Sequence, residues 1–238
     1  MASPFITSVL ESPVRVIMEV KPRDGHGCDL LRDRRAADMA VEYVRAGAPC
    51  VSVVTGRWFG GEDRLLREVA CATDVPLLKK DFIRTDADLA SAKALGASAA
   101  LLTAGILPRR ILRRRIATAL REGLTPFVEV ASEAELEHVI EPAACVIAIN
   151  NKEIASRERD AGNLDRSFSL LDAAQSIGTS CPVSASGVQT PTDAARLLNA
   201  GFAAVLVGTS LLRAASVERW VDEMQLNLVR PRATGREG

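Results

Sequence analysis

The chain repeats one pattern eight times: a short apolar run, followed by a longer segment in which apolar residues recur with helical spacing. The runs are apolar almost throughout, which is typical of parallel strands covered by helices. We expect strands at 14–20, 50–55, 76–82, 99–105, 125–130, 145–150, 181–186 and 203–209. Helical segments are clearest at 33–47, 86–96, 132–140, 191–201 and 210–224.

Eight strand–helix units follow one another at a spacing of roughly 25–30 residues, with no visible linker between them. A chain of 238 residues has the length of one α/β barrel, which often reaches about 250 residues. We therefore predict a single (β/α)8 TIM barrel over residues 1–226 and a polar tail over 227–238. An open doubly wound sheet is the alternative. It would more often carry a glycine-rich fingerprint after its first strand, and this chain has none.

Composition excludes several classes of function. Thirty Lys+Arg balance thirty Asp+Glu, so no overall positive field favours nucleic acid or an anionic membrane. No apolar run approaches the length of a membrane helix, and the first residues do not resemble a secretory signal. The five cysteines form no CxxC pair, which indicates a reducing cytoplasm. His26 and His138 lack partners at ligand spacing, so we expect no metal site.

Three charged or aromatic segments have more than one interpretation. The basic run at 109–115 is far more typical of a solvated helix face or an oligomer contact than of a nucleic-acid site. The segment 57–61 is either a mobile flap or a loop anchored by a buried Trp58. We expect a loop at 153–167 that could cover the mouth of the barrel. Nothing in the sequence separates a monomer from a homo-oligomer.

In this fold the functional residues stand at the carboxyl ends of the strands. The ends of the first, third, fifth and sixth expected strands carry ionisable or amide side chains, which are Glu19, Lys21, Lys79, Lys80, Asp81, Glu129, Asn150 and Lys152. Any one of them could simply form an ion pair. A fold does not need so many such groups in one layer, so the whole set predicts a functional site.

The last two strand ends are turns of small residues that lead into helices. Gly187 and Gly208 would let backbone N–H groups approach an anion, and Ser186 and Thr209 add hydroxyl groups. The loops after the seventh and eighth strands form a recurring phosphate site of this fold. We therefore predict phosphate binding at these turns, against the simpler interpretation of two tight turns.

The strand ends carry the motifs "VRVIMEVKP", "LLKKDFI", "PFVEV", "IAINNK", "VSASGV" and "VLVGTSLL". In these motifs and their order, from about residue 5 to about residue 225, the chain resembles the indole-3-glycerol phosphate synthase family. The family is a lyase of tryptophan biosynthesis that needs no cofactor or metal. It closes the indole ring of 1-(2-carboxyphenylamino)-1-deoxyribulose 5-phosphate with loss of CO2 and water.

The resemblance implies a role for each matching residue. Lys80 would be the general acid, and Glu19 an acid/base. Lys21 would meet the phosphate and take part in proton transfer. The remaining roles are a second acid at Glu129, a substrate-orienting amide at Asn150, a phosphate cradle at Ser186, Gly187, Gly208 and Thr209, and ring-flanking residues at Phe59 and Phe82. Strand alternation turns Lys79 away from the mouth, so we expect a structural role for it.

Four departures from the family pattern surround the expected site. Ala185 replaces a glutamate of the seventh strand, and "KPRDGHG" replaces a Ser-Pro-Ser loop after the first strand. Lys152 stands where arginine is common in the family. The two parallel hydrogen bonds that an arginine could make to a substrate carboxylate are thereby replaced by the single charge of an ammonium group. The N-terminal extension is short.

These departures lead to the hypothesis of a divergent member or paralogue. It would act on the family substrate or a substituted analogue in a specialised pathway. Two other hypotheses remain open. One is a non-catalytic barrel that binds a phosphorylated metabolite. The other is a different phosphosugar isomerase or lyase that forms a Schiff base on Lys80.

Overall fold

The computed structural model describes residues 3–153, 160 and 162–229 of the 238-residue chain. Eight parallel strands close into one barrel in chain order, and the last strand pairs with the first. The strands are β1 (Val16–Val20), β2 (Val51–Val54), β3 (Leu77–Lys80), β4 (Ala99–Thr103), β5 (Thr125–Val130), β6 (Val146–Asn150), β7 (Cys181–Ala185) and β8 (Ala204–Val207). The predicted (β/α)8 barrel is confirmed.

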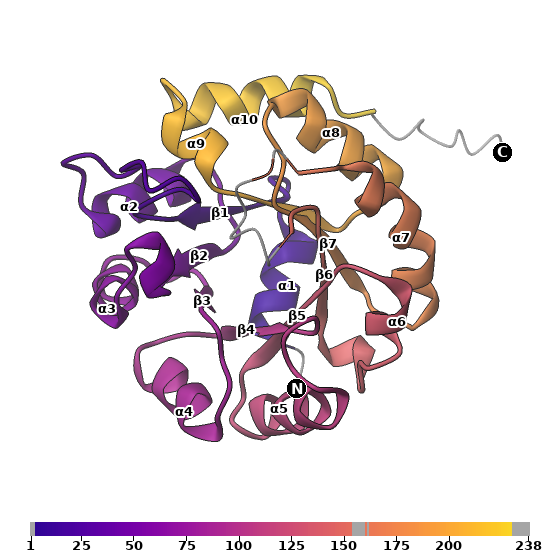
Figure 1. Ribbon diagram of the computed structural model, residues 1–238. Helices are drawn as coiled ribbons and strands as arrows, with labels where there is room; N and C mark the ends of the chain where they lie inside the picture. Colours follow the sequence, from indigo (N-terminus) through magenta and orange to yellow (C-terminus); the bar gives the residue numbers. More distant parts are fainter. Residues whose placement is uncertain (1–2, 154–159, 161, 230–238) are drawn as a thin grey trace, which may run out of the picture.

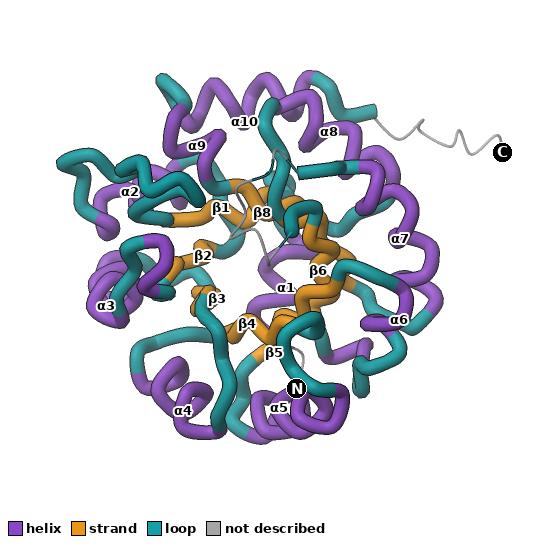
Figure 2. The backbone as a smooth tube through the Cα atoms, in the orientation of Figure 1, coloured by secondary structure: helices purple, strands orange, loops and turns teal. Residues whose placement is uncertain are grey.

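Helices surround the ring of strands, as Figures 1 and 2 show. They are α2 (Ala36–Arg45), α3 (Asp63–Ala72), α4 (Asp86–Ala94), α5 (Arg109–Arg121), α6 (Glu133–Leu136), α7 (Asp165–Ser176), α8 (Pro191–Ala200), α9 (Thr209–Arg213) and α10 (Val217–Leu226). Two 3-10 turns, η1 (Arg57–Phe59) and η2 (Pro142–Ala144), lie in the connecting loops. Side-chain caps start several helices; Thr85 and Asp88, for example, form a full capping box at α4.

Alternation along the strands creates two separate apolar cores. Outward side chains such as Met18 and Leu102 pack against the surrounding helices. Inward side chains such as Ile17, Leu78 and Phe127 pack against one another inside the barrel. Because every strand is covered on both sides, its residues are buried throughout, which explains the continuous apolar runs in the sequence.

A further helix, α1 (Pro4–Glu11), closes the end of the barrel where the strands begin. Figure 2 shows it behind the ring of strands. Phe5 packs edge-on against Phe127 at 6.1 Å between ring centroids, and it belongs to the inner core. The Ser8 hydroxyl donates to the carbonyl of Pro49, just before β2. The segment that precedes the first strand therefore forms the floor of the barrel.

Two expected helices differ from the structure. The helix expected at 132–140 is a single turn, α6, because Arg113 donates to two carbonyls that follow it and Pro142 begins a separate turn. The helix expected at 210–224 is divided into α9 and α10. Ser216 caps α10 by accepting from the Arg219 N–H, and this cap sets a new helix start.

The basic run at 109–115 lies in α5, as expected. Most of its arginines face solvent, but Arg115 is buried and its Nε donates to the carbonyl of Arg84 at 3.0 Å. The run is therefore mostly an exposed helix face, and its role as a solvated face or an oligomer contact stays a prediction. At the other boundary, α10 ends at Leu226, and residues 230–238 of the expected tail lie outside the described residues.

Candidate active site

The inward-facing residues change character toward the carboxyl ends of the strands, the end that faces the viewer in Figure 1. Glu19, Lys80 and Glu129 each stand two positions after an inner-core residue, so they point to the same interior. All three are buried. Lys21 follows β1 in the same alternation and is also buried. The residues expected to carry the chemistry therefore meet at one mouth.

Lys80 forms a buried ion pair at the centre of this mouth. Its Nζ lies 2.9 Å from Oε2 of Glu19, and both side chains are less than 10% exposed. The hydroxyl of Ser52 lies 3.5 Å from the same carboxylate oxygen. Burying two charges costs several kcal/mol per ion unless they are paired, so this geometry holds an ammonium and a carboxylate in reach of each other.

Lys79 points to the opposite side of β3, as expected from strand alternation. Its Nζ pairs with Asp63 at the start of α3. It lines neither of the two cavities described below. The two adjacent lysines therefore lie on opposite sides of β3. Lys79 forms an ion pair with a helix residue, and Lys80 points into the mouth of the barrel.

Glu129 is held by the amide of Asn150. Nδ2 of Asn150 donates to Oε1 of Glu129 at 3.0 Å, and Oδ1 of Asn150 accepts from the backbone N–H of Lys152 at 2.9 Å. Asn150 is fully buried and lines neither cavity. In this geometry Asn150 holds the Glu129 carboxylate in place. The substrate-orienting role that the resemblance implied for its amide stays a prediction.

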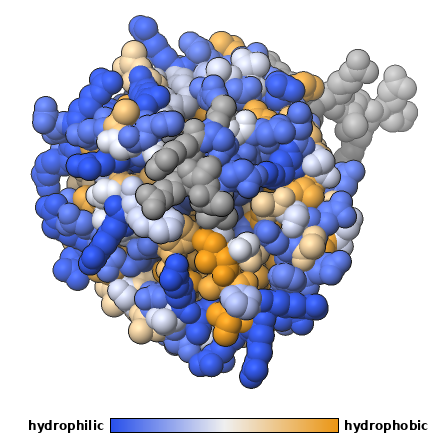
Figure 3. All heavy atoms as spheres, viewed as in Figure 1, coloured by the Kyte–Doolittle hydropathy of each residue, from blue (hydrophilic) through white to orange (hydrophobic). Residues whose placement is uncertain are grey.

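A cavity of about 1030 Å³ opens on one side of the Lys80–Glu19 pair; we call it the aromatic cavity. Lys21, Lys80, Phe59, Phe82, Leu101 and Glu129 are among its lining residues. Nζ of Lys21 lies 4.0 Å from the ring centroid of Phe59. Figure 3 shows apolar side chains gathered near the centre of this face, among hydrophilic neighbours. A flat aromatic ring suits such walls.

Trp58 also lines this cavity, but it is not the buried anchor considered above. It is 54% exposed and packs against Phe82, with ring centroids 4.8 Å apart. The loop fold depends instead on Gly61, where an added Cβ would lie 2.4 Å from the carbonyl oxygen of Val54. A half-exposed indole at a cavity rim can contact a ligand.

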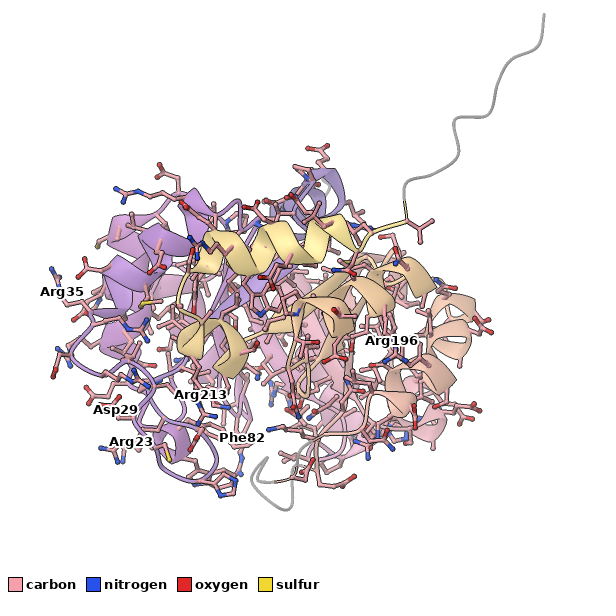
Figure 4. The ribbon with its side chains drawn as sticks, turned by 90° about the horizontal axis from the view of Figure 1, so that it is seen from above. Arg23, Asp29, Arg35, Phe82, Arg196 and Arg213 are labelled. Atoms are coloured by element: carbon pink, nitrogen blue, oxygen red, sulfur yellow. The ribbon has the colours of Figure 1, made fainter. Side chains whose placement is uncertain are left out.

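A second cavity, of about 700 Å³, lies on the other side of the ion pair; we call it the phosphate-side cavity. Lys152 lines it, and so do the residues of the two small-residue turns, which are Ser186, Gly187, Gly208 and Thr209. Lys21 and Lys80 line both cavities. Figure 4 shows Phe82 of one cavity and Arg213 of the other at the same end of the molecule. The two cavities therefore meet at the lysines.

Residues that the sequence analysis did not single out hold these turns in place. Nδ2 of Asn151 lies within 3.0–3.1 Å of the Ser184 hydroxyl and of the carbonyls of Ala185 and Ser186. This amide supports Ser186 at a φ of +64°, which is unusual for a residue with a side chain. The signal in the sequence was a second asparagine directly after the sixth strand.

Ser210 joins the loops after β7 and β8. Its hydroxyl donates to the carbonyl of Gln189 at 2.6 Å and accepts from Nε1 of Trp220 at 3.0 Å. The two turns are thus fastened to each other and to α10. A serine inside "GTSLL" gave no sequence signal for this long-range role.

Gly208 has a steric role that the sequence did not predict. A Cβ at this position would lie 2.6 Å from Oε1 of Glu19. The absent side chain makes room for the buried carboxylate, in addition to any approach of an anion to the turn. Because β8 pairs with β1, this contact depends on closure of the barrel.

Two departures from the family pattern are visible in the geometry. Ala185 is fully buried and pairs in register with Asn150, so the mouth has no carboxylate at this strand position. In the altered loop after β1, Asp24 accepts from the N–H groups of His26 and Cys28 and pairs with Arg213. Burial alone would raise the pKa of Asp24, but these bonds and Arg213 outweigh it, and the pKa is lowered.

Thr103 is a further polar residue in the barrel mouth. It pairs in register with Glu129, and its buried hydroxyl has no hydrogen-bond partner in the described part of the chain.

Within residues 3–153, 160 and 162–229, no group of three or more His, Cys, Asp or Glu side chains is arranged to hold a metal ion. Nor is any helix in residues 3–153 or 162–229 long and apolar enough to cross a membrane.

Comparison with known proteins assigns the chain to a family. The sequence model of the family described as "Indole-3-glycerol phosphate synthase" matches residues 3–224. "Indole-3-glycerol phosphate synthase 1" of Streptomyces coelicolor is 37% identical over 200 residues, which cover 84% of this chain and 72% of that protein. A synthase of Alkaliphilus metalliredigens is 32% identical over 216 residues (90% and 81%), and one of Kineococcus radiotolerans is 34% identical over 213 residues (89% and 76%).

The family match spans the barrel from α1 to α10, and it includes every strand end that contributes to the two cavities. The chain therefore belongs to the indole-3-glycerol phosphate synthase family.

Proposed function

We propose that this protein is a carboxy-lyase that closes an indole ring. Its substrate would be 1-(2-carboxyphenylamino)-1-deoxyribulose 5-phosphate or a ring-substituted analogue. The observation that carries the proposal is the buried Lys80–Glu19 pair between an aromatic cavity and a phosphate-side cavity. A substrate with a ring at one end and a phosphate at the other would span both cavities and present its carbonyl to Lys80.

The phosphate end would lie against the turns at Ser186–Gly187 and Gly208–Thr209, with Lys21 and Lys152 supplying positive charge. The ring would lie between Phe59, Phe82 and Leu101. This placement puts the ketone carbon of the sugar chain at the junction of the cavities. Holding both ends makes the ring carbon and the ketone carbon effectively neighbours, which removes much of the entropic barrier.

Ring closure needs a proton at one atom. As the carboxylate-bearing ring carbon attacks the ketone carbon, the ketone oxygen gains negative charge, and the Lys80 ammonium donates a proton to it. The ring carboxylate then leaves as CO2, and its bonding electrons restore the aromatic ring. Glu19, at 2.9 Å, can then relay a proton from solvent to Lys80, which restores the ammonium for the next step.

Dehydration completes the reaction. The new hydroxyl group leaves as water after it is protonated, and the neighbouring carbon loses a proton to form the double bond of the indole. Glu129, oriented by Asn150, is the group we propose to accept or relay that proton. The apolar wall near Leu101 would keep water from the departing carboxylate.

The family resemblance also makes the two other hypotheses less favourable. A pure binder gains nothing from a buried ammonium beside two buried acids. We also propose a cytoplasmic location, which the unpaired cysteines favour, because reduced thiols are typical of cytoplasmic proteins.

The direct test is incubation of the purified protein with the carboxyphenylamino sugar phosphate. We expect indole absorbance to appear together with an equal amount of CO2. If neither appears at high enzyme concentration, with this substrate or its ring-substituted analogues, the proposed reaction is wrong. Borohydride should not trap an adduct on Lys80, and a trapped adduct would favour a Schiff-base lyase.

A further inference from the structure

The aromatic cavity is lined by two arginines, Arg57 and Arg84, that the proposed reaction does not use. Five cations line it, which are Lys21, Arg57, Arg64, Lys80 and Arg84. Arg64 pairs with Glu62 and Glu68, and Lys80 pairs with Glu19. Within residues 3–153, 160 and 162–229, the guanidinium groups of Arg57 and Arg84 make no ion pair and no hydrogen bond.

The acids near these arginines already have other partners. In the cavity wall, Asp63 pairs with Lys79, and Asp81 accepts from the Thr55 hydroxyl and the Phe82 N–H. Beyond it, Asp88 accepts from two backbone N–H groups at the start of α4. The two guanidinium groups are therefore left available to an anion from outside.

Both arginines stand beside the residues proposed to hold the ring. Arg57 directly precedes Trp58 in η1, and Arg84 follows Phe82 by two residues in the loop before α4. Trp58 and Phe82 pack against each other, so the two loops meet at the rim of the cavity. With the sugar phosphate in the other cavity, this rim would face the edge of the ring that is remote from the reacting carbons.

The reacting carboxylate of the substrate is a poor candidate for the anion that Arg57 and Arg84 would bind. It loses its negative charge when it leaves as CO2, so a cation paired with it stabilises the bound substrate more than the transition state. Pairing with two arginines would slow the reaction. A second anionic group that the ring keeps throughout would be bound equally well in both states, and it would lower KM without this penalty.

We infer that the aromatic cavity selects a substrate whose ring carries a second, retained anionic substituent, such as a carboxylate, held by Arg57 and Arg84. This inference rests on the proposed ring-closing reaction and specifies its substrate class. The substituent belongs at ring position 4 or 5, counted from the reacting carboxylate carbon as position 1 and the amine carbon as position 2.

The experiment compares three substrates: the unsubstituted carboxyphenylamino sugar phosphate and its analogues with a second carboxylate at position 4 or 5. We expect kcat/KM of the wild-type protein to be about tenfold higher for one of the dicarboxylates, with most of the difference in KM. Two exposed ion pairs typically contribute this much together. The preference should shrink as salt is raised, because exposed charges are screened.

Variants assign the preference to the arginines. Arg57→Gln and Arg84→Gln combined should remove it, so that the ratio of kcat/KM between the preferred dicarboxylate and the unsubstituted substrate falls to about one. Arg84→Lys in an otherwise unchanged chain should keep part of it. Arg45→Gln is the matched control, because Arg45 is an exposed arginine at the C-terminal end of α2, away from the mouth.

The possible failures are distinguishable. Equal or better turnover of the unsubstituted substrate by the wild-type protein would overturn the inference and leave the proposed function standing. A preference for a dicarboxylate that survives the double substitution would also overturn it. Absence of CO2 from all three substrates would overturn the proposed function, and the inference with it.

Discussion

The two ends of the barrel interior are built by the same strands, yet they carry opposite kinds of side chains. At the floor, Ile17, Leu78 and Phe127 pack with Phe5 of α1 into an apolar core. Two residues further along the same strands stand Glu19, Lys80 and Glu129. A step of two residues advances about 6.6 Å along a strand and keeps the side chain on the same side.

This difference separates stability from chemistry within a single molecule. Burial of the floor residues removes apolar surface from water, which stabilises the fold. Burial of the charged mouth residues adds little to the stability of the fold and requires oppositely charged or hydrogen-bonding partners. Substitutions at the floor should therefore change the free energy of unfolding and leave kcat alone. Substitutions at the mouth should change kcat most, and should lower stability only where they leave a buried charge without its partner.

The largest expected effect is the loss of activity in Lys80→Met. Without the general acid, kcat should fall about 10²–10⁴-fold in an assay of CO2 release. Lys79→Met is the matched control, because Lys79 faces α3, and its kcat should stay within about twofold of the wild-type value. Equal losses in the two variants would contradict the assignment of Lys80.

The same variant also probes the buried pair. Lys80→Met leaves the Glu19 carboxylate buried without its partner, so stability in urea should fall at neutral pH. Adding Glu19→Gln removes the stranded charge and should restore most of the stability without restoring activity. A double variant no more stable than the single one would show that the pair is not electrostatically coupled.

The next largest effect concerns the floor. Phe5→Ala should lower the free energy of unfolding by about 3–5 kcal/mol, since it removes a fully buried ring that packs against Phe127. Urea denaturation measures the loss, and kcat of the folded protein should change little. A stability loss below about 1 kcal/mol would mean that α1 does not seal the barrel.

Ala185→Glu tests the carboxylate that the mouth lacks. If its absence limits turnover of the unsubstituted substrate, kcat should rise by about tenfold, within the range of one acid–base group. Ala185→Gln has a similar shape without the charge, so it should give no gain. Unchanged or lower turnover in Ala185→Glu would count against this explanation of the divergent site.

The smallest expected effect is in thiol reactivity. Cys28 and Cys71 are exposed, whereas Cys50, Cys145 and Cys181 are buried. Burial raises the pKa of Cys145 and of Cys181 to about 12 and raises that of Cys50 as well. A thiol reagent at pH 8 should therefore titrate two thiols in the native protein and five in urea. Rapid reaction of a third thiol in the native protein would show that the core opens.

Much of the architecture could be predicted from the sequence, because local patterns decide it. Apolar runs alternating with helical segments indicate a parallel barrel, and alternation within "LLKKDF" assigns Lys79 and Lys80 to opposite sides of β3. Helix ends were less predictable. The segment 132–140 forms one turn because Arg113 and Pro142 compete with helical hydrogen bonding, and only one of these lies nearby in the sequence.

The candidate site divides in the same way. Residue types and strand positions are enough to predict Glu19, Lys80 and Glu129 at one mouth. Their partners required the fold: Glu19 pairs with Lys80 two strands away, Asn150 lies behind Glu129, and Gly208 leaves space for Glu19 across the closing β8–β1 pair. Alternation and periodicity are properties of a few neighbouring residues. Contacts between strands depend on the register and closure of the whole barrel, which no short stretch of the chain contains.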